Sequence, residues 1–135
     1  MPALIEAMQA QEAQVRRYAT RALSHLGDAR ATDVLIEALE DPSYSVRWLA
    51  AEGLVAIGPE AVAPLLRAMS ARVVRAWFRQ GAFHVLNKVE GVGNAEAQWL
   101  RRIAARVKRD PAEELPLLAR RALDEWQRLW AGASG

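Results

Sequence analysis

Residues 15–58 read VRRYATRALSHLGDARATDVLIEALEDPSYSVRWLAAEGLVAIG, and one pattern occurs twice within them. A shift of 31 residues carries the opening valine-arginine pair and the first glycine onto their second copies. The same shift places LIEAM at 4–8 over LIEAL at 35–39, and a further shift of 28 starts a looser third copy at 74. Self-similarity at a fixed period of this size indicates a repeat architecture.

The period inside each copy is that of a helix. Val15, Ala19, Leu23 and Leu26 step along one helical face, and no strand-like alternation of apolar and polar residues occurs anywhere. Capping residues stand directly before prolines, as in Asp41-Pro42, which is typical of helix starts. The sequence therefore predicts eight helices, near 2–10, 12–26, 29–40, 42–57, 59–70, 72–89, 95–109 and 112–131.

A single pair of such helices cannot bury its own apolar stripe, so neighbouring pairs must cover it. We therefore expect one all-α domain, residues 1–135, built as an α-solenoid of stacked antiparallel helix pairs. The expected divisions are a half unit at 1–10, full units at 12–40, 42–70 and 72–109, and a C-terminal capping helix at 112–131. The start at 2–10 lacks a partner helix, which leaves Leu4, Ile5 and Met8 partly uncovered. This predicts either self-association through this half unit or continuation into further repeats, as in a fragment of a longer protein.

The quoted stretch resembles HEAT repeats of the short type found in phycobilisome lyase subunits. The resemblance implies a right-handed solenoid of about four units, whose second helices line a concave binding face. The third copy departs from the pattern, since Phe78 and Arg79 stand where small residues are expected. The fourth copy departs as well, with Pro116 in place of the arginine.

Composition restricts the chemistry that the chain can perform. The 135 residues include no cysteine, which excludes disulfides, thiolate metal sites and cysteine nucleophiles. His25 and His84 fall two repeats apart, on the order of 20 Å from one another, too far to share one metal ion. The glycines at 91–94 lack the lysine of a phosphate loop. We expect no catalytic residue, no metal, no cofactor and no enzyme activity.

The N-terminus lacks a signal-peptide layout, and no uncharged apolar run approaches the roughly 18 residues of a membrane span. We therefore expect a cytoplasmic protein that does not bind membranes.

Charge is unevenly placed along the chain. The net charge is −4 over residues 1–66, +8 over 67–109 and −2 over 110–135. The basic block suits an acidic partner, because few carboxylates within it neutralise the cations.

The second helices carry the predicted binding surface. Aligning LIEAM, LIEAL, LLRAM and WLRRI puts four charged residues in one file along the presumed concave face: Glu6, Glu37, Arg67 and Arg101. The predicted function is a protein-protein interaction scaffold that binds its partner on this face. The predicted contact residues are Arg30, Asp33, Glu37, Arg67, Arg101, Arg102 and Arg106.

Nucleic-acid binding is the alternative function. The 67–109 block would contact phosphates, and similarity to HEAT-like DNA glycosylases would suggest the same. The repeated arginines and the tryptophans each have a structural and a functional interpretation. Arg16, Arg47 and Arg75 recur at one repeat position and are expected to pair with acidic turn residues such as Asp28 or Asp41. The five tryptophans are expected in the core, with a binding hot spot as the other reading.

Overall fold

The computed structural model describes residues 1–134, and Gly135 lies outside the described part. Every regular element within that range is a helix or a short 3₁₀ turn. The helices are α1 (Pro2–Ala7), α2 (Ala13–Leu26), α3 (Thr32–Glu37), α4 (Tyr44–Ile57), α5 (Val62–Ser70), α6 (Ala76–Lys88), α7 (Asn94–Arg109) and α8 (Leu115–Ser134). The 3₁₀ turns are η1 (Ala29–Ala31), η2 (Ala38–Glu40), η3 (Gly58–Ala61) and η4 (Ala112–Glu114).

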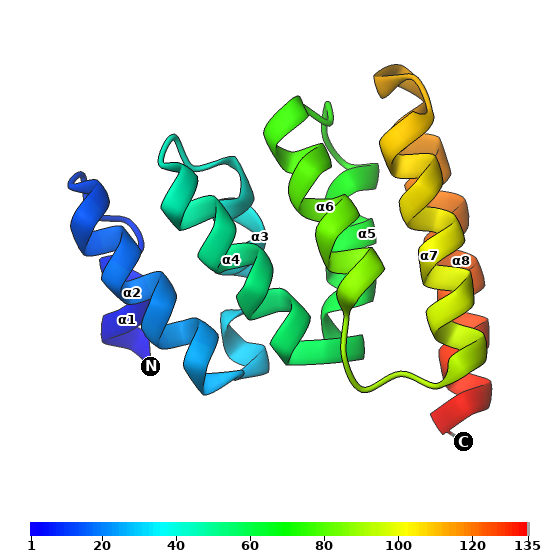
Figure 1. Cartoon of the computed structure of the whole chain (residues 1–135), viewed down its shortest axis with the longest axis horizontal. Coiled ribbons are helices and arrows are strands. Elements are labelled where there is room, and N and C mark those ends of the chain that lie inside the picture. The colour runs from blue at the N-terminus through cyan, green and yellow to red at the C-terminus, as the bar shows by residue number, and fades with distance from the viewer. Residues whose placement is uncertain (135) are drawn as a thin grey trace.

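The helices form two layers, as Figure 1 shows. The first layer holds α2, α4, α6 and α7, and the second layer holds α1, α3, α5 and α8. Within the first layer α2 packs on α4, α4 on α6 and α6 on α7. One continuous cluster of buried apolar residues runs from Met8 to Trp126 between the layers. The predicted all-α solenoid is therefore confirmed.

Two glycines permit close packing, of α4 against α2 and of α6 against η2. A Cβ atom added to Gly53 on α4 would lie 2.7 Å from the Ser24 Oγ on α2. At Gly81, the equivalent position on α6, it would lie 2.7 Å from a Leu39 methyl carbon in η2. Both distances are shorter than a carbon atom tolerates, so the absent side chain is what permits this spacing.

The last unit differs from the expected pairing. The predicted unit 72–109 would place α7 in the second layer, as the partner of α6. Instead α7 lies beside α6 in the first layer and runs antiparallel to it (Figure 1). The predicted capping helix, α8, takes the vacant position in the second layer and packs along α5.

The link between α6 and α7 accounts for this arrangement. The backbone N–H of Glu90 donates to the carbonyl of Val55, 3.3 Å away, so the link passes beside the end of α4. Gly58, with φ of +88°, ends α4 there, and a Cβ on it would lie 2.9 Å from the Glu90 carbonyl oxygen. The chain is thus led along the edge of the array rather than back into the second layer.

One stretch of the described chain, Tyr44–Ser70, is long and apolar enough to span a membrane by composition alone. It is folded as α4 and α5, and 61% of its most apolar window is buried inside the protein. The core position of these helices explains their apolar composition. The expected cytoplasmic location stays a prediction.

Candidate functional site

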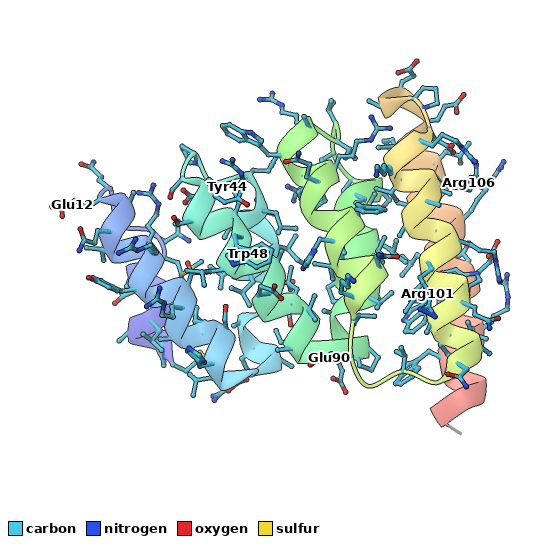
Figure 2. All side chains as sticks on the ribbon, in the orientation of Figure 1. Glu12, Tyr44, Trp48, Glu90, Arg101 and Arg106 are labelled. Carbon is cyan, nitrogen blue, oxygen red and sulfur yellow. The ribbon has the colours of Figure 1, made fainter. Side chains whose placement is uncertain are left out.

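Exposed aromatic side chains gather between α4 and α6. Tyr44 is 71% exposed, Trp48 is 47% exposed and Trp77 is 46% exposed. They border an open groove of about 310 Å³, which we name the α4/α6 groove. It is lined by Tyr44, Arg47, Trp48, Ala51, Trp77, Gln80, Gly81, Phe83 and His84. Tyr44 and Trp48 lie one turn apart on the same side of α4 (Figure 2).

Arg47 is held between two of these rings. Its guanidinium carbon lies 4.1 Å from the centre of the Trp77 ring and 5.7 Å from that of Tyr44. Its Nη1 donates to the backbone carbonyls of Asp41 at 2.8 Å and Pro42 at 3.1 Å. These contacts fix the cation before any ligand arrives, so little side-chain entropy is left to lose on binding.

The far end of the groove is formed by α6. The His84 ring lies 5.4 Å from the Trp48 ring, and its Nε2 lies 3.7 Å from a Glu52 carboxylate oxygen. His25 is exposed on α2, two repeats away from His84. Residues 1–134 contain no group of three His, Asp or Glu side chains placed to hold a metal ion.

The tryptophans divide into two sets. Trp126 is 1% exposed and stacks on Trp99 at 5.7 Å and on Trp130 at 5.4 Å between ring centres. This stack joins α7 to α8, as the structural reading expects. Trp48 and Trp77 instead line the groove and are about half exposed, so the expected core position is wrong for these two; their role as a hot spot stays a prediction. The exposure of Trp48 can be read from the sequence. It lies two positions from each of the buried residues Val46 and Ala50, so its side chain points away from the helix face that they share.

All seven predicted contact residues are exposed, but they do not form one surface. Asp33, Glu37 and Arg67 lie on α3 and α5 in the second layer, and Arg30 lies on η1 directly before α3. Arg30 pairs with Asp28, with 2.8 Å between Nη2 and Oδ2. The hydrogen bonds from the Arg30 guanidinium and backbone N–H lower the pKa of Asp28 to about 2.

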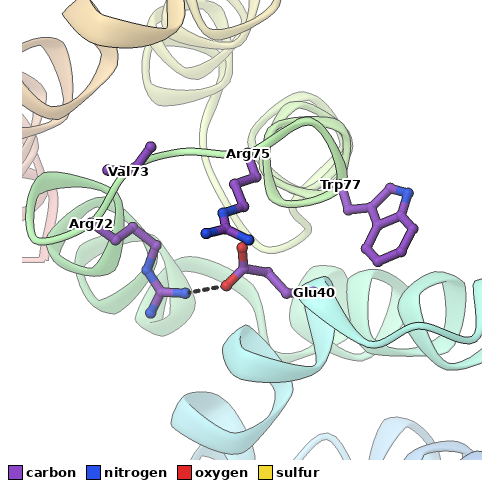
Figure 3. Close-up of a pocket in the computed structure, with 5 residues that line it drawn as sticks. All are labelled: Glu40, Arg72, Val73, Arg75 and Trp77. Atoms are coloured by element: carbon purple, nitrogen blue, oxygen red, sulfur yellow. Dashed lines mark hydrogen bonds and ion pairs between the residues drawn. The ribbon is translucent and has the colours of Figure 1, made fainter.

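Glu37 is likewise engaged, because it forms an ion pair with Arg72 at the end of α5. Arg72 also pairs with Glu40 at 3.0 Å, and Figure 3 shows Arg75 pointing toward Glu40 from the α6 side. The charges of this region therefore bind repeats to one another.

Arg101, Arg102 and Arg106 lie on α7 and so belong to the first layer. The expected file from Glu37 through Arg67 to Arg101 is thus interrupted, because α8 and not α7 follows α5 in the second layer. Arg106 also pairs with Asp110 at 3.0 Å, which neutralises part of the basic stripe.

The predicted arginine pairing is confirmed at one position. Arg16 pairs with Asp41 at 2.7 Å, whereas Asp28 pairs with Arg30 and Arg47 stacks on Trp77. At the amino-terminal end Leu4 and Ile5 are half-buried. Met8 is buried, and its sulfur accepts a hydrogen bond from Thr20. Self-association through this half unit stays a prediction.

The two layers of helices define an α-solenoid, and its first layer carries an open groove. The HEAT repeat family matches residues 1–87, and the chain belongs to that family. It is also similar to the phycocyanobilin lyase subunit alpha of Picosynechococcus sp., with 39% identity over 79 residues. The match covers 58% of this chain but only 30% of that relative, so the chain spans less than a third of the relative's length.

Proposed function

We propose that this chain is a non-enzymatic scaffold that binds a protein partner in the α4/α6 groove. HEAT repeats are in general scaffolds for protein interactions. The observation that carries the proposal is the gathering of Tyr44, Trp48 and Trp77, all exposed, around a positioned arginine. Tyrosine, tryptophan and arginine are the residues most enriched where protein interfaces derive their affinity.

Burial of these rings by a partner would supply the driving force. Exposed aromatic surface costs free energy in water, and a large aromatic side chain buries on the order of 150–250 Å². The surrounding helices are packed into the core, so the groove keeps its shape without a partner. A preformed surface loses less entropy on association than a loop would.

The contact residues that the sequence predicted on the second layer are less suited to bind a partner. Arg30 and Glu37 already have charged partners within the chain, Asp28 and Arg72. A partner would have to break or share these ion pairs. We therefore place the primary contact surface in the first layer, and Arg67 and Asp33 stay predicted contacts of a secondary surface.

The experiment is differential affinity capture from the source lysate, with and without nuclease. The bait is the wild-type chain, the double variant Trp48→Ala with Trp77→Ala, or the control Tyr18→Ala. Tyr18 is 55% exposed on α2, outside the groove, so this control removes exposed aromatic surface from another part of the chain. We expect proteins that wild type and Tyr18→Ala retain with nuclease present and the double variant loses. Identical capture by all three would reject the groove as the site.

Nucleic-acid binding through the 67–109 block remains the alternative. Several of its cations are engaged within the protein, including Arg72 with Glu37 and Glu40 and Arg109 with Asp110. Phosphate contacts would make binding fall steeply with salt. A gel-shift series with duplex and single-stranded oligonucleotides tests this, and no shift at about 50 mM salt would remove the alternative.

The lyase relative does not extend the proposal to catalysis. Its name describes a lyase subunit, and the matched stretch is 30% of that protein. We carry over its repeat architecture and not its activity.

A further inference from the structure

We infer that a second groove, between α6 and α7, binds a carboxylate side chain of an acidic, partly apolar peptide segment. This α6/α7 groove has a volume of about 570 Å³ and is the counterpart of the α4/α6 groove one helix further along. Val74, Phe83 and Ala112 give it an apolar lining, and Arg79 and Lys108 contribute two cations. The inference does not require the α4/α6 groove to be a binding site.

Arg79 is the residue that sets this groove apart. A shift of 28 residues places it on Ala51, which lines the α4/α6 groove, so a cation replaces a methyl group at the equivalent position. Its Nε donates to the carbonyl of Val107 at 2.7 Å. That carbonyl would take its helical hydrogen bond from residue 111, but Pro111 has no N–H. The end of α7 thus provides the acceptor that holds Arg79 in place.

The guanidinium of Arg79 has hydrogen-bonding capacity left over. Its Nη2 is buried and has no hydrogen-bond partner among the described residues. No acidic residue lines the groove. A partly buried cation without an anion beside it is unfavourable, and a carboxylate in the groove would supply that anion through a charge-assisted hydrogen bond.

Lys108 supplies the second positive charge from α7. Its ammonium lies 5.0 Å from the centre of the Phe83 ring, a cation–π contact that holds it over the apolar surface. Charge complementarity therefore calls for an anion that carries apolar surface beside it. An aspartate or glutamate flanked by leucines fits this description, whereas a nucleic-acid backbone is charged at every step and is usually tracked by a longer cationic surface.

The two grooves adjoin each other, because Gln80 and Phe83 line both. One extended segment could therefore place an apolar or aromatic side chain against Trp48 and a carboxylate against Arg79. The acidic contact is nevertheless tested on its own.

The test measures fluorescence polarisation of a fluorescein-labelled peptide that alternates Glu or Asp with Leu. The comparison peptide has Gln and Asn in place of the acids. The protein variants are Lys108→Gln and Arg79→Lys, and the control is Lys88→Gln, an exposed lysine of α6 outside the groove. The control removes the same charge as Lys108→Gln, so it corrects for general electrostatic attraction.

We expect the neutral peptide and Arg79→Lys each to weaken binding by about tenfold or more, since a charge-assisted pair is lost or its geometry spoiled. Lys108→Gln should weaken it by roughly three- to tenfold, and Lys88→Gln by less than about twofold. Thermal melts report whether Arg79→Lys remains folded. If Arg79→Lys does not fold, the comparison of Lys108→Gln with Lys88→Gln still tests the inference, because Lys108 is exposed.

Equal binding of the acidic and neutral peptides would overturn the inference, as would an equal loss in Lys88→Gln. An oligonucleotide that displaces the peptide and binds more tightly would also overturn it, if its binding depends on Arg79 and Lys108. That outcome would favour phosphate binding. The double variant Trp48→Ala with Trp77→Ala separates the two proposals. It should keep the preference for the acidic peptide even if the α4/α6 groove has no partner.

Discussion

Arg16 on α2 donates from Nε to Oδ2 of Asp41 across 2.7 Å, and only 14% and 9% of these side chains are exposed. Arg16 also donates from Nη1 to the carbonyls of Ala10 and Gln11, just ahead of α2. Arg47 makes the same pair of backbone bonds one repeat later. The sequence repeat of 31 residues is therefore also a repeat of individual hydrogen bonds.

Replacing Asp41 with Asn should destabilise the fold by about 2–4 kcal/mol, because the shielded Arg16 cation then has no anion. Urea unfolding followed by circular dichroism measures the change. The control is Asp33→Asn, an exposed acid, for which we expect a change within about 0.5 kcal/mol. Equal midpoints for the Asp41 variant and wild type would show that the pair does not stabilise the repeat interface.

Gly53→Ala should destabilise the protein by about 1–2 kcal/mol, although alanine favours helices. The added methyl group would meet Ser24, whose Oγ lies 2.7 Å and whose Cα lies 3.3 Å from it. Gly132→Ala is the matched control, because it lies in α8 with nothing within 4 Å. We expect that control to gain up to about 1 kcal/mol. A higher melting temperature for both variants would contradict the close approach of α2 and α4.

Trp126→Ala should cost about 3–5 kcal/mol, because it leaves a cavity between α7 and α8 and removes two ring stacks. Trp48→Ala should cost less than about 1 kcal/mol, since half of that side chain is already in water. Chemical unfolding of both variants gives the comparison. Similar losses for the two would mean that Trp48 belongs to the core and not to a binding groove.

The Asp28 carboxylate should titrate near pH 2, because its pKa is lowered to about 2 by hydrogen bonds from Arg30. The folded state thus favours the carboxylate form of Asp28. The contribution of this carboxylate to folding stability is therefore complete above the ordinary pKa near 3.8, and it is lost as the pH falls toward 2. NMR titration of the side-chain carboxyl carbon measures it. Arg30→Ala should raise the pKa toward the ordinary value, while Arg21→Ala should leave it unchanged.

The helices were predictable from sequence because their signals are local. Apolar spacing acts within a few positions, so the predicted ranges match the observed helices to within a few residues at most ends. The predicted helix start at Asp41-Pro42 is wrong, because Ser43 is the N-cap of α4 and the helix begins at Tyr44. On α7 the buried residues Leu100, Ile103, Ala104 and Val107 are spaced as one face of a helix, so this stripe is also readable from sequence.

The layer that α7 joins was not predictable in the same way. Its apolar stripe suits either layer, and the choice depends on distant contacts, namely the bond from Glu90 to Val55 and the fit of α8 along α5. The prediction that Arg101 continues the file of charged residues on the second helices was wrong for this reason.

The candidate site was only partly predictable. Exposure of Trp48 follows from its helical phase, and Arg79 stood out because it breaks the small-residue pattern. The grooves themselves need three-dimensional information, because their facing sides come from residues 25 or more positions apart in the sequence. Arg79 approaches Val107 only after α7 has entered the first layer.

The reversed direction of α7 also bears on protein engineering. Arrays of this kind are normally lengthened by appending consensus modules at an end, which requires that successive modules point the same way. Beyond α7 successive modules no longer point the same way. A module appended there would therefore pack against a helix that runs in the opposite direction. Extra modules belong instead between α2 and α4, where the spacing of 31 residues allows an in-frame insertion.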